Sequence, residues 1–275
     1  MKLSFTALLF LIGLSDSFSQ DGLLKTHPQL AYWKLGDQSD VVIVLHGGPA
    51  VQHEYLRPEF DGLTKSATVI YYDQRGCGKS ERADSYTWQD HVKDLHRLIN
   101  TVAPKKKVFL AGSSWGSLLA ILYTCSYPVK IKGVILSGTI KWLGQGLPYI
   151  RESDFVYNNP HKQPLYEKSL VKTVGADKPD SINISKMIEA QSGIQHSEPV
   201  ASLISAPIPD SLSRIRTPIL LFNGSHSRKF DWVDNYMTLL PQTELHTFEA
   251  AGHDPWFSDP VRFSEYCNTF ISKHK

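Results

Sequence analysis

A serine in the first half of the chain stands in a pattern that is typical of an enzymatic nucleophile. Ser114 is the centre of residues 112–116, Gly-Ser-Ser-Trp-Gly, which fit the pattern Gly-x-Ser-x-Gly. We expect a strand before this segment and an apolar helix after it. In that context the chain turns so tightly that the neighbours must be small, and the strained turn lifts the hydroxyl above the sheet. The N-terminus of the helix also points free backbone N–H groups toward the site where negative charge develops during the reaction.

A histidine near the end of the chain is the expected general base. His253 follows the last expected strand, and the order of serine first and histidine later suits a sheet with a nucleophile turn. A loop at this point allows the imidazole to reach the hydroxyl of Ser114 and to shuttle its proton. We therefore predict that His253 activates Ser114.

A third group should orient the imidazole, and it is expected after the strand of residues 219–222. The loop that follows offers two carboxylates, Asp231 and Asp234. We favour Asp231, because Asp234 can instead begin the next helix, where a carboxylate near the N-terminus is stabilising. The choice between the two stays open at this point.

An oxyanion hole needs two backbone N–H groups that face the same oxygen. The N–H of Trp115, directly after the nucleophile, is the first candidate. The segment His46-Gly47-Gly48-Pro49 follows a strand and matches the type of loop that supplies the second, from Gly48 or Gly47, of which we favour Gly48. We expect His46 to shape this loop.

Short apolar runs alternate with helical patterns along the chain, which predicts an α/β protein with a parallel sheet wrapped by helices. The run Val41–Leu45 is apolar throughout, as in a strand buried on both faces. Thr87 is the expected N-cap of a helix. The expected strands cover residues 41–45, 67–72, 108–111, 131–136, 219–222 and 244–248, and the expected helices cover residues 87–102, 115–125 and 260–272.

The first residues differ from the rest of the chain. Lys2 precedes an apolar run from Leu3 to Leu14, and small residues at Ser17 and Ser19 provide a cleavage site. This pattern predicts a secretory signal peptide over residues 1–20 and a secreted or periplasmic protein. The apolar run is short for a membrane span, although an uncleaved anchor is the alternative.

Two segments, residues 21–139 and 215–275, carry the regular pattern and form the expected α/β core. Residues 140–214 lack the pattern and are rich in Pro, Asn and Ser, so we expect a cap or lid inserted between two strands, with disorder as the alternative. The formal net charge of +2 gives no electrostatic case for nucleic acid. The three cysteines, Cys77, Cys125 and Cys267, are widely spaced and are expected to be free.

Together these segments resemble the proline iminopeptidase branch of the α/β-hydrolases. Residues 73–80, Asp-Gln-Arg-Gly-Cys-Gly-Lys-Ser, are close to the DQRGxGxS signature of that branch, and Gly252-His253 also matches it. The resemblance covers roughly residues 40–140 and 215–272. It implies a mostly parallel, eight-stranded type of sheet flanked by helices, an inserted cap, and a Ser-His-Asp triad that needs no metal or organic cofactor. It also implies a structural role for residues 73–80, whereas residue types alone would make Asp73, with Arg75 beside it, a candidate for a catalytic role.

Two departures from the family pattern bear on function. The family acid usually lies three residues after the glycine of the penultimate-strand loop, and here that position is Ser227. The cap is also short, and the possible anchors for a substrate amino group are Glu152, Asp154, Glu167 and Glu189. We expect hydrolysis of an amide or ester in a small molecule or short peptide, first at N-terminal proline. The alternatives are a small-ester carboxylesterase and a non-catalytic binding protein on a hydrolase scaffold.

Overall fold

The computed structural model describes residues 21–48, 51–139, 211–225, 232–249 and 251–275. The expected signal peptide, most of the expected cap, Ser227 and Asp231 lie outside these residues. The four cap carboxylates also lie outside them. Asp234 lies in a described helix, but its side chain is not among those described.

The described residues form one sheet of eight strands in the order β1-β2-β4-β3-β5-β6-β7-β8. β2 pairs antiparallel with β1 and β4, and every other pairing is parallel. This confirms the expected mostly parallel, eight-stranded sheet, whereas the two N-terminal strands were not predicted. The strands are β1 (Gly22–Leu24), β2 (Leu30–Leu35), β3 (Val41–Leu45), β4 (Thr68–Tyr72), β5 (Val108–Ser113), β6 (Ile131–Ser137), β7 (Ile219–Gly224) and β8 (Thr243–Phe248).

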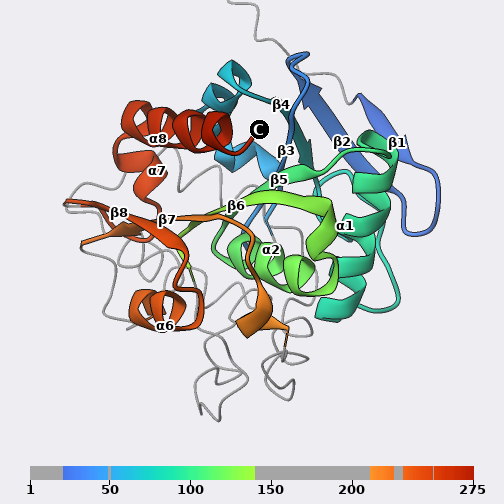
Figure 1. The fold of residues 1–275 in the computed structure, drawn as a ribbon. Helices are drawn as coiled ribbons and strands as arrows, with labels where there is room; N and C mark the ends of the chain where they lie inside the picture. Colours follow the sequence, from blue (N-terminus) through green and yellow to red (C-terminus); the bar gives the residue numbers. More distant parts are fainter. Residues whose placement is uncertain (1–20, 49–50, 140–210, 226–231, 250) are drawn as a thin grey trace, which may run out of the picture.

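Helices cover both faces of the sheet (Figure 1). α1 (Trp88–Val102) and α2 (Trp115–Ser126) pack on one face, and α8 (Pro260–Lys273) packs on the other with the 3-10 helices η1 (His53–Leu56) and η2 (Glu59–Lys65). Alternate residues of β3 face opposite layers: Ile43 joins the core under α1 and α2, and Val42 joins the core under α8. This explains why the whole strand is apolar. The remaining helical segments are η3 (Pro128–Lys130), η5 (Leu212–Arg214), α6 (Trp232–Leu239) and α7 (Pro255–Ser258).

The helix predicted from residue 87 begins with a reciprocal cap. The hydroxyl of Thr87 accepts from the N–H of Asp90, and the carboxylate of Asp90 accepts from the N–H of Thr87. This arrangement satisfies two backbone donors that the first turn would otherwise leave without partners. The expected N-cap at Thr87 is confirmed.

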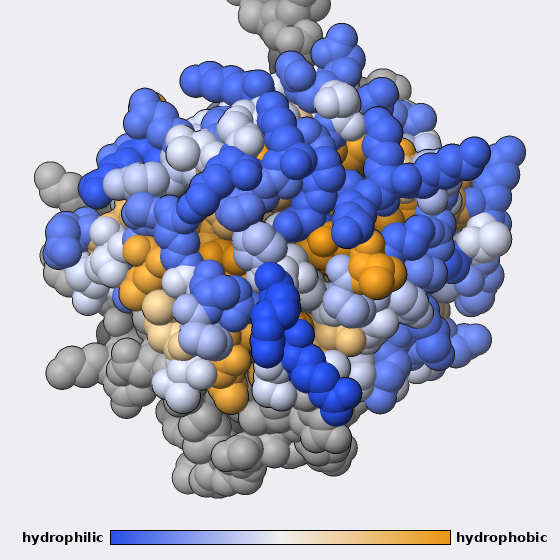
Figure 2. Space-filling model, viewed as in Figure 1, coloured by the Kyte–Doolittle hydropathy of each residue, from blue (hydrophilic) through white to orange (hydrophobic). Residues whose placement is uncertain are grey.

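The face drawn in Figure 2 is mainly hydrophilic, with small separate hydrophobic areas. Within the described part of the chain, no helix has both the length and the apolar character needed to cross a membrane. All three cysteines are free thiols, as expected, and Cys77 and Cys267 are buried.

Candidate active site

The backbone at Ser114 has the conformation that a nucleophile turn requires. Its φ is 54° and its ψ is −119°, and it is the only non-glycine residue with a positive φ in the described part of the chain. A side chain in this region of φ/ψ space costs on the order of 1–3 kcal/mol and persists where the surroundings enforce it. Ser114 joins the end of β5 to the start of α2, and it is half-buried.

Two glycines enforce this turn by allowing close approach of the backbone. A Cβ on Gly112 would lie 2.4 Å from the carbonyl carbon of Gly116, and a Cβ on Gly116 would lie 2.0 Å from the oxygen of Leu45. No side chain fits at such distances. The spacing Gly-x-Ser-x-Gly therefore has a steric cause, because α2 begins in contact with both β5 and β3.

The turn is also anchored to the end of the neighbouring strand β6. The N–H of Ser114 donates to the carbonyl oxygen of Ser137 at 2.9 Å. The hydroxyl of Ser117 lies 2.7 Å from the oxygen of Gly112 and 2.8 Å from that of Ser137, and it accepts from the N–H of Ser137 at 3.0 Å. The C-terminal ends of β5 and β6 are thus joined around the candidate nucleophile.

His253 lies beside the end of β6, next to the turn that carries Ser114. A Cβ on Gly138, the residue after Ser137, would be 3.2 Å from both Cε1 and Nε2 of the His253 ring and 2.5 Å from the carbonyl oxygen of His253. Ser114 and His253 therefore both lie against the Ser137-Gly138 segment. The structure brings the two residues to one end of the sheet although they are far apart in the sequence.

The loop that carries the candidate acids starts beside the histidine loop. A Cβ on Gly224, the last residue of β7, would be 2.1 Å from the oxygen of Gly252, which directly precedes His253. The N–H of Ser225 donates to the oxygen of Phe248 at 3.0 Å. These contacts place the beginning of the acid-bearing loop next to His253.

The loop after β3 reaches the candidate nucleophile from the other side. A Cβ on Gly47 would lie 3.2 Å from the Cβ of Ser114. The N–H of Gly47 donates to the hydroxyl of Tyr55 at 2.7 Å, so of the two candidate glycines Gly47 already uses its N–H within the protein. Trp115 is the first residue of α2, where an N–H has no acceptor within its own helix.

His46 holds this loop in shape and is not placed as a base. It is fully buried, and burial lowers the pKa of its ring to about 4, so the imidazole is neutral at pH 7. Its Nε2 accepts from the N–H of Gln74 at 2.9 Å, which leaves Nδ1 to donate to the oxygen of Gly47 at 2.9 Å.

Gln74 links the two segments that would supply the oxyanion donors. Its Oε1 accepts from the indole N–H of Trp115 at 2.8 Å, and its Nε2 donates to the carbonyl oxygen of His46 at 2.8 Å. Our sequence interpretation gave the segment of residues 73–80 a structural role but did not single out Gln74. Its position between a glycine-rich loop and the nucleophile turn could be found only in three dimensions.

Asp73 and Arg75 do not pair with each other, and both are engaged in other interactions. The Asp73 carboxylate accepts from His53 Nδ1 at 2.8 Å and from the N–H of Lys79 at 2.8 Å. Burial alone would raise the pKa of Asp73, but the interactions with His53, His46 and the N–H of Lys79 together outweigh it and lower that pKa.

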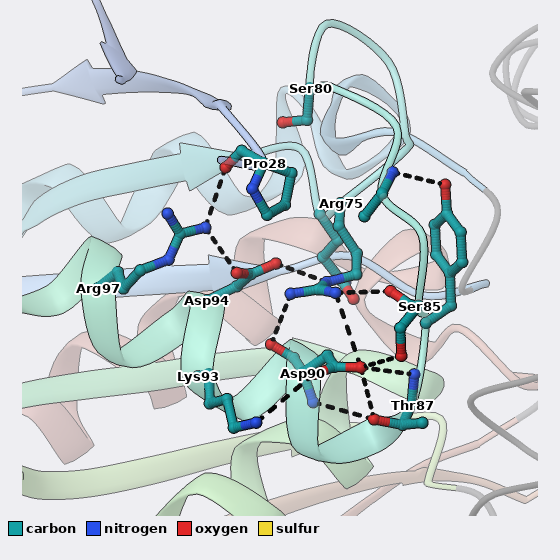
Figure 3. Close-up of polar contacts among 12 residues, drawn as sticks. Pro28, Arg75, Ser80, Ser85, Thr87, Asp90, Lys93, Asp94 and Arg97 are labelled. Carbon is teal, nitrogen blue, oxygen red and sulfur yellow. Dashed lines mark hydrogen bonds and ion pairs between the residues drawn. The ribbon is translucent and has the colours of Figure 1, made fainter. Parts of the chain in front are cut away.

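Arg75 is buried and faces α1 (Figure 3). Its guanidinium donates to the carboxylate of Asp94 at 2.7 Å and to the carbonyl oxygens of Ser85 and Asp90. Asp94 also accepts from Arg97 at 2.6 Å. This cluster fastens the loop of residues 73–80 to α1, which is a structural task.

Comparison with known proteins gives a consistent result. The model of the alpha/beta hydrolase fold family matches residues 40–260. A proline iminopeptidase from Lactobacillus crispatus is 27% identical over 273 residues, which cover 85% of this chain and 90% of that protein. One from Thermoplasma volcanium is 36% identical over 124 residues, but the match spans only 43% of this chain and 42% of that protein.

Solved structures show the same fold at low sequence identity. An esterase from Thermogutta terrifontis superposes with a TM-score of 0.74 at 22% identity, covering 90% of this chain and 95% of that one. A proline iminopeptidase from Mycobacterium smegmatis superposes with a TM-score of 0.71 at 19% identity, covering 93% of this chain and 98% of that one.

Proposed function

This chain belongs to the alpha/beta hydrolase fold family, and we propose that it is a serine hydrolase that cleaves an amide or ester bond. The observation that carries the proposal is the strained conformation of Ser114, with a φ of 54°, at a turn that also contacts the loop of His253 through Ser137 and Gly138. A non-glycine residue held in this conformation between a strand and a helix is suited to presenting its hydroxyl to a substrate.

In the proposed reaction, the Ser114 oxygen attacks the carbonyl carbon of the substrate. His253 takes the hydroxyl proton and then gives it to the leaving group. The N–H groups of Trp115 and Gly48 donate to the oxyanion. Water then cleaves the acyl-enzyme by the same route, with His253 again acting as base.

Asp231 is the proposed third member of the triad. Its loop begins at Gly224, which packs against Gly252, one residue before the base. A carboxylate from this loop would hold the imidazole in the correct tautomer and stabilise the imidazolium. Asp234, in α6, is the alternative acid.

The proposed substrate is a short peptide or aminoacyl compound with N-terminal proline. Support comes from relatives named proline iminopeptidase, which match most of this chain at about 27% identity. We also propose that the protein is exported, on the basis of the apolar segment of residues 3–14. Amino-terminal sequencing of the mature protein should then begin after residue 19 or 20.

A fluorophosphonate probe tests the serine chemistry directly. The Ser114 oxygen forms a bond to phosphorus, fluoride leaves, and the proton passes to the base. We expect mass spectrometry to find the adduct on Ser114 and to find no adduct in Ser114→Ala. Ser126→Ala, at the far end of α2, should label like the unmodified protein. A folded sample that stays unlabelled would favour the binding-protein alternative.

A substrate panel then separates the two hydrolytic activities. Prolyl-arylamide should be cleaved faster than other aminoacyl-arylamides and faster than short-chain aryl esters. Preference for the aryl esters would make the protein a carboxylesterase and would refute the iminopeptidase assignment.

A further inference from the structure

Asp254, the residue after His253, is a buried carboxylate that does not cap the backbone of the helix it precedes. It occupies the N-cap position of α7, where an aspartate normally accepts from the first backbone N–H groups. Here the side chain makes no such bond. Its Oδ1 instead accepts from the hydroxyl of Ser113 at 3.1 Å and from the indole N–H of Trp256 at 3.2 Å.

The contact with Ser113 extends into a chain of buried groups. Ser113 directly precedes the candidate nucleophile, and its side chain is also hydrogen-bonded to Tyr55. The Ser113 hydroxyl therefore lies between Tyr55 and Asp254. Burial and the nearby Asp254 carboxylate raise the pKa of Tyr55, so its hydroxyl stays protonated. The Tyr55 oxygen accepts from the N–H of Gly47 at 2.7 Å.

These contacts connect the oxyanion loop to the histidine loop. The N–H of Gly47 donates to Tyr55, the Tyr55 hydroxyl contacts that of Ser113, and Ser113 donates to Asp254, which also accepts from Trp256. The four side chains are at most 6% exposed, so water does not compete for their hydrogen bonds. Each segment that the proposed function needs, namely the oxyanion loop, the nucleophile turn and the histidine loop, contributes at least one member.

We infer that Asp254 is a positioning residue, which fixes the His253 loop relative to Ser114 and the oxyanion loop by accepting a hydrogen bond from Ser113. The inference rests on the proposed function, because it concerns the alignment of that same site. A misplacement of about 1 Å can reduce a reaction rate on the order of a hundredfold. Breaking the chain of contacts should therefore slow the reaction of Ser114 more than it unfolds the protein.

The test is the second-order rate constant for labelling by the fluorophosphonate probe in three variants. Asp254→Ala removes the acceptor, Ser113→Ala removes the middle link, and Tyr55→Phe removes the link to Gly47. We expect each to lower the rate constant about ten- to a hundredfold. Asp254→Asn keeps an oxygen at the acceptor position and should stay within about threefold of the unmodified rate, a rescue that a general loss of stability would not give.

Ser264→Ala is the matched control, because it removes a buried hydroxyl on α8 that contacts Asn268 and none of these groups. It should label at the unmodified rate. The double variant Ser113→Ala/Tyr55→Phe should be no slower than the slower single variant, since both break the same chain. Circular dichroism checks that each variant is folded. If Asp254→Ala does not fold, the test still stands on Ser113→Ala and Tyr55→Phe, each of which removes only one oxygen.

The outcomes separate the inference from the proposed function. If the folded, unmodified protein is not labelled at all, the proposed function and the inference both fail. If it is labelled, but Ser113→Ala and Tyr55→Phe react at the same rate as the unmodified protein, only the inference fails. Equal loss in Asp254→Asn and Asp254→Ala would also overturn it, because the acceptor alone would then not explain the effect.

Discussion

The imidazole of His253 lies directly against Gly138, so closely that a Cβ on this glycine would be 3.2 Å from the ring nitrogen Nε2. Gly138 also has a φ of 55°, and the residue before it accepts the hydrogen bond from the N–H of Ser114. One glycine thus provides both the room for the proposed base and the turn that ends β6.

Replacement of Gly138 by alanine should displace the histidine loop. A Cβ at this position would lie 2.5 Å from the carbonyl oxygen of His253, so the backbone must shift. We expect the rate of labelling of Ser114 to fall about a hundredfold. Gly36→Ala is the control, because Gly36 also has a positive φ but its Cβ would meet no atom nearer than 3.5 Å. Gly36→Ala should lose about 1–2 kcal/mol of stability from its positive φ and react at the unmodified rate, whereas Gly138→Ala should lose more stability and react slowly.

Gln74→Leu should weaken both the fold and the proposed oxyanion hole. The substitution leaves the Trp115 indole N–H and the His46 carbonyl oxygen buried without their partner. We expect urea denaturation to show a loss of about 2–3 kcal/mol and labelling to slow at least tenfold. Gln242→Leu, which removes two bonds to backbone carbonyl oxygens away from the site, should leave the labelling rate unchanged.

Stability should fall as the pH drops from 7 to 5. Burial lowers the pKa of His46 to about 4 and that of His91 to about 3, from the usual 6.5. At a pH between the lowered pKa of the folded state and the usual pKa of 6.5, the unfolded chain binds protons that the folded chain does not. The free energy of unfolding therefore decreases as the pH falls. Each histidine should contribute about 2 kcal/mol to the difference between pH 7 and pH 5. The lowered pKa of Asp73 acts below pH 3.8, outside this interval.

His91→Phe isolates one of these contributions. The ring of His91 packs edge-on against Trp115, and phenylalanine fills similar space without a titrating group. Urea denaturation at pH 7 and pH 5 should give a difference about 2 kcal/mol smaller in the variant than in the unmodified protein. An unchanged difference would show that His91 is not responsible.

Asp231→Asn should lower turnover by orders of magnitude, up to about 10⁴-fold, because an amide can no longer hold the base in the required tautomer. Asp234→Asn is the matched control, since it makes the same change three residues further along the chain. If Asp234→Asn is the damaging variant, Asp234 is the acid. If both variants turn over substrate normally, the protein works without either carboxylate.

The pattern of residues along the chain was enough to predict the parallel strands of the sheet and the segments that carry the candidate site. The apolar runs of β3, β5 and β6 can be recognised as strands in the sequence, because both faces of each strand are buried. The glycines around Ser114 likewise indicate a tight turn, because close contact between backbones excludes every larger residue at these positions. The strands β1 and β2 were missed, since short, partly exposed antiparallel strands leave a weak pattern.

Which polar groups meet in the folded protein could not be predicted from the order of residues. Neither the type nor the spacing of Gln74, Tyr55 and Asp254 indicated a role in the site, and their partners Trp115, Gly47 and Ser113 lie in other segments of the chain. Hydrogen bonds between such groups depend on how strands and loops come together, and no local periodicity records that arrangement.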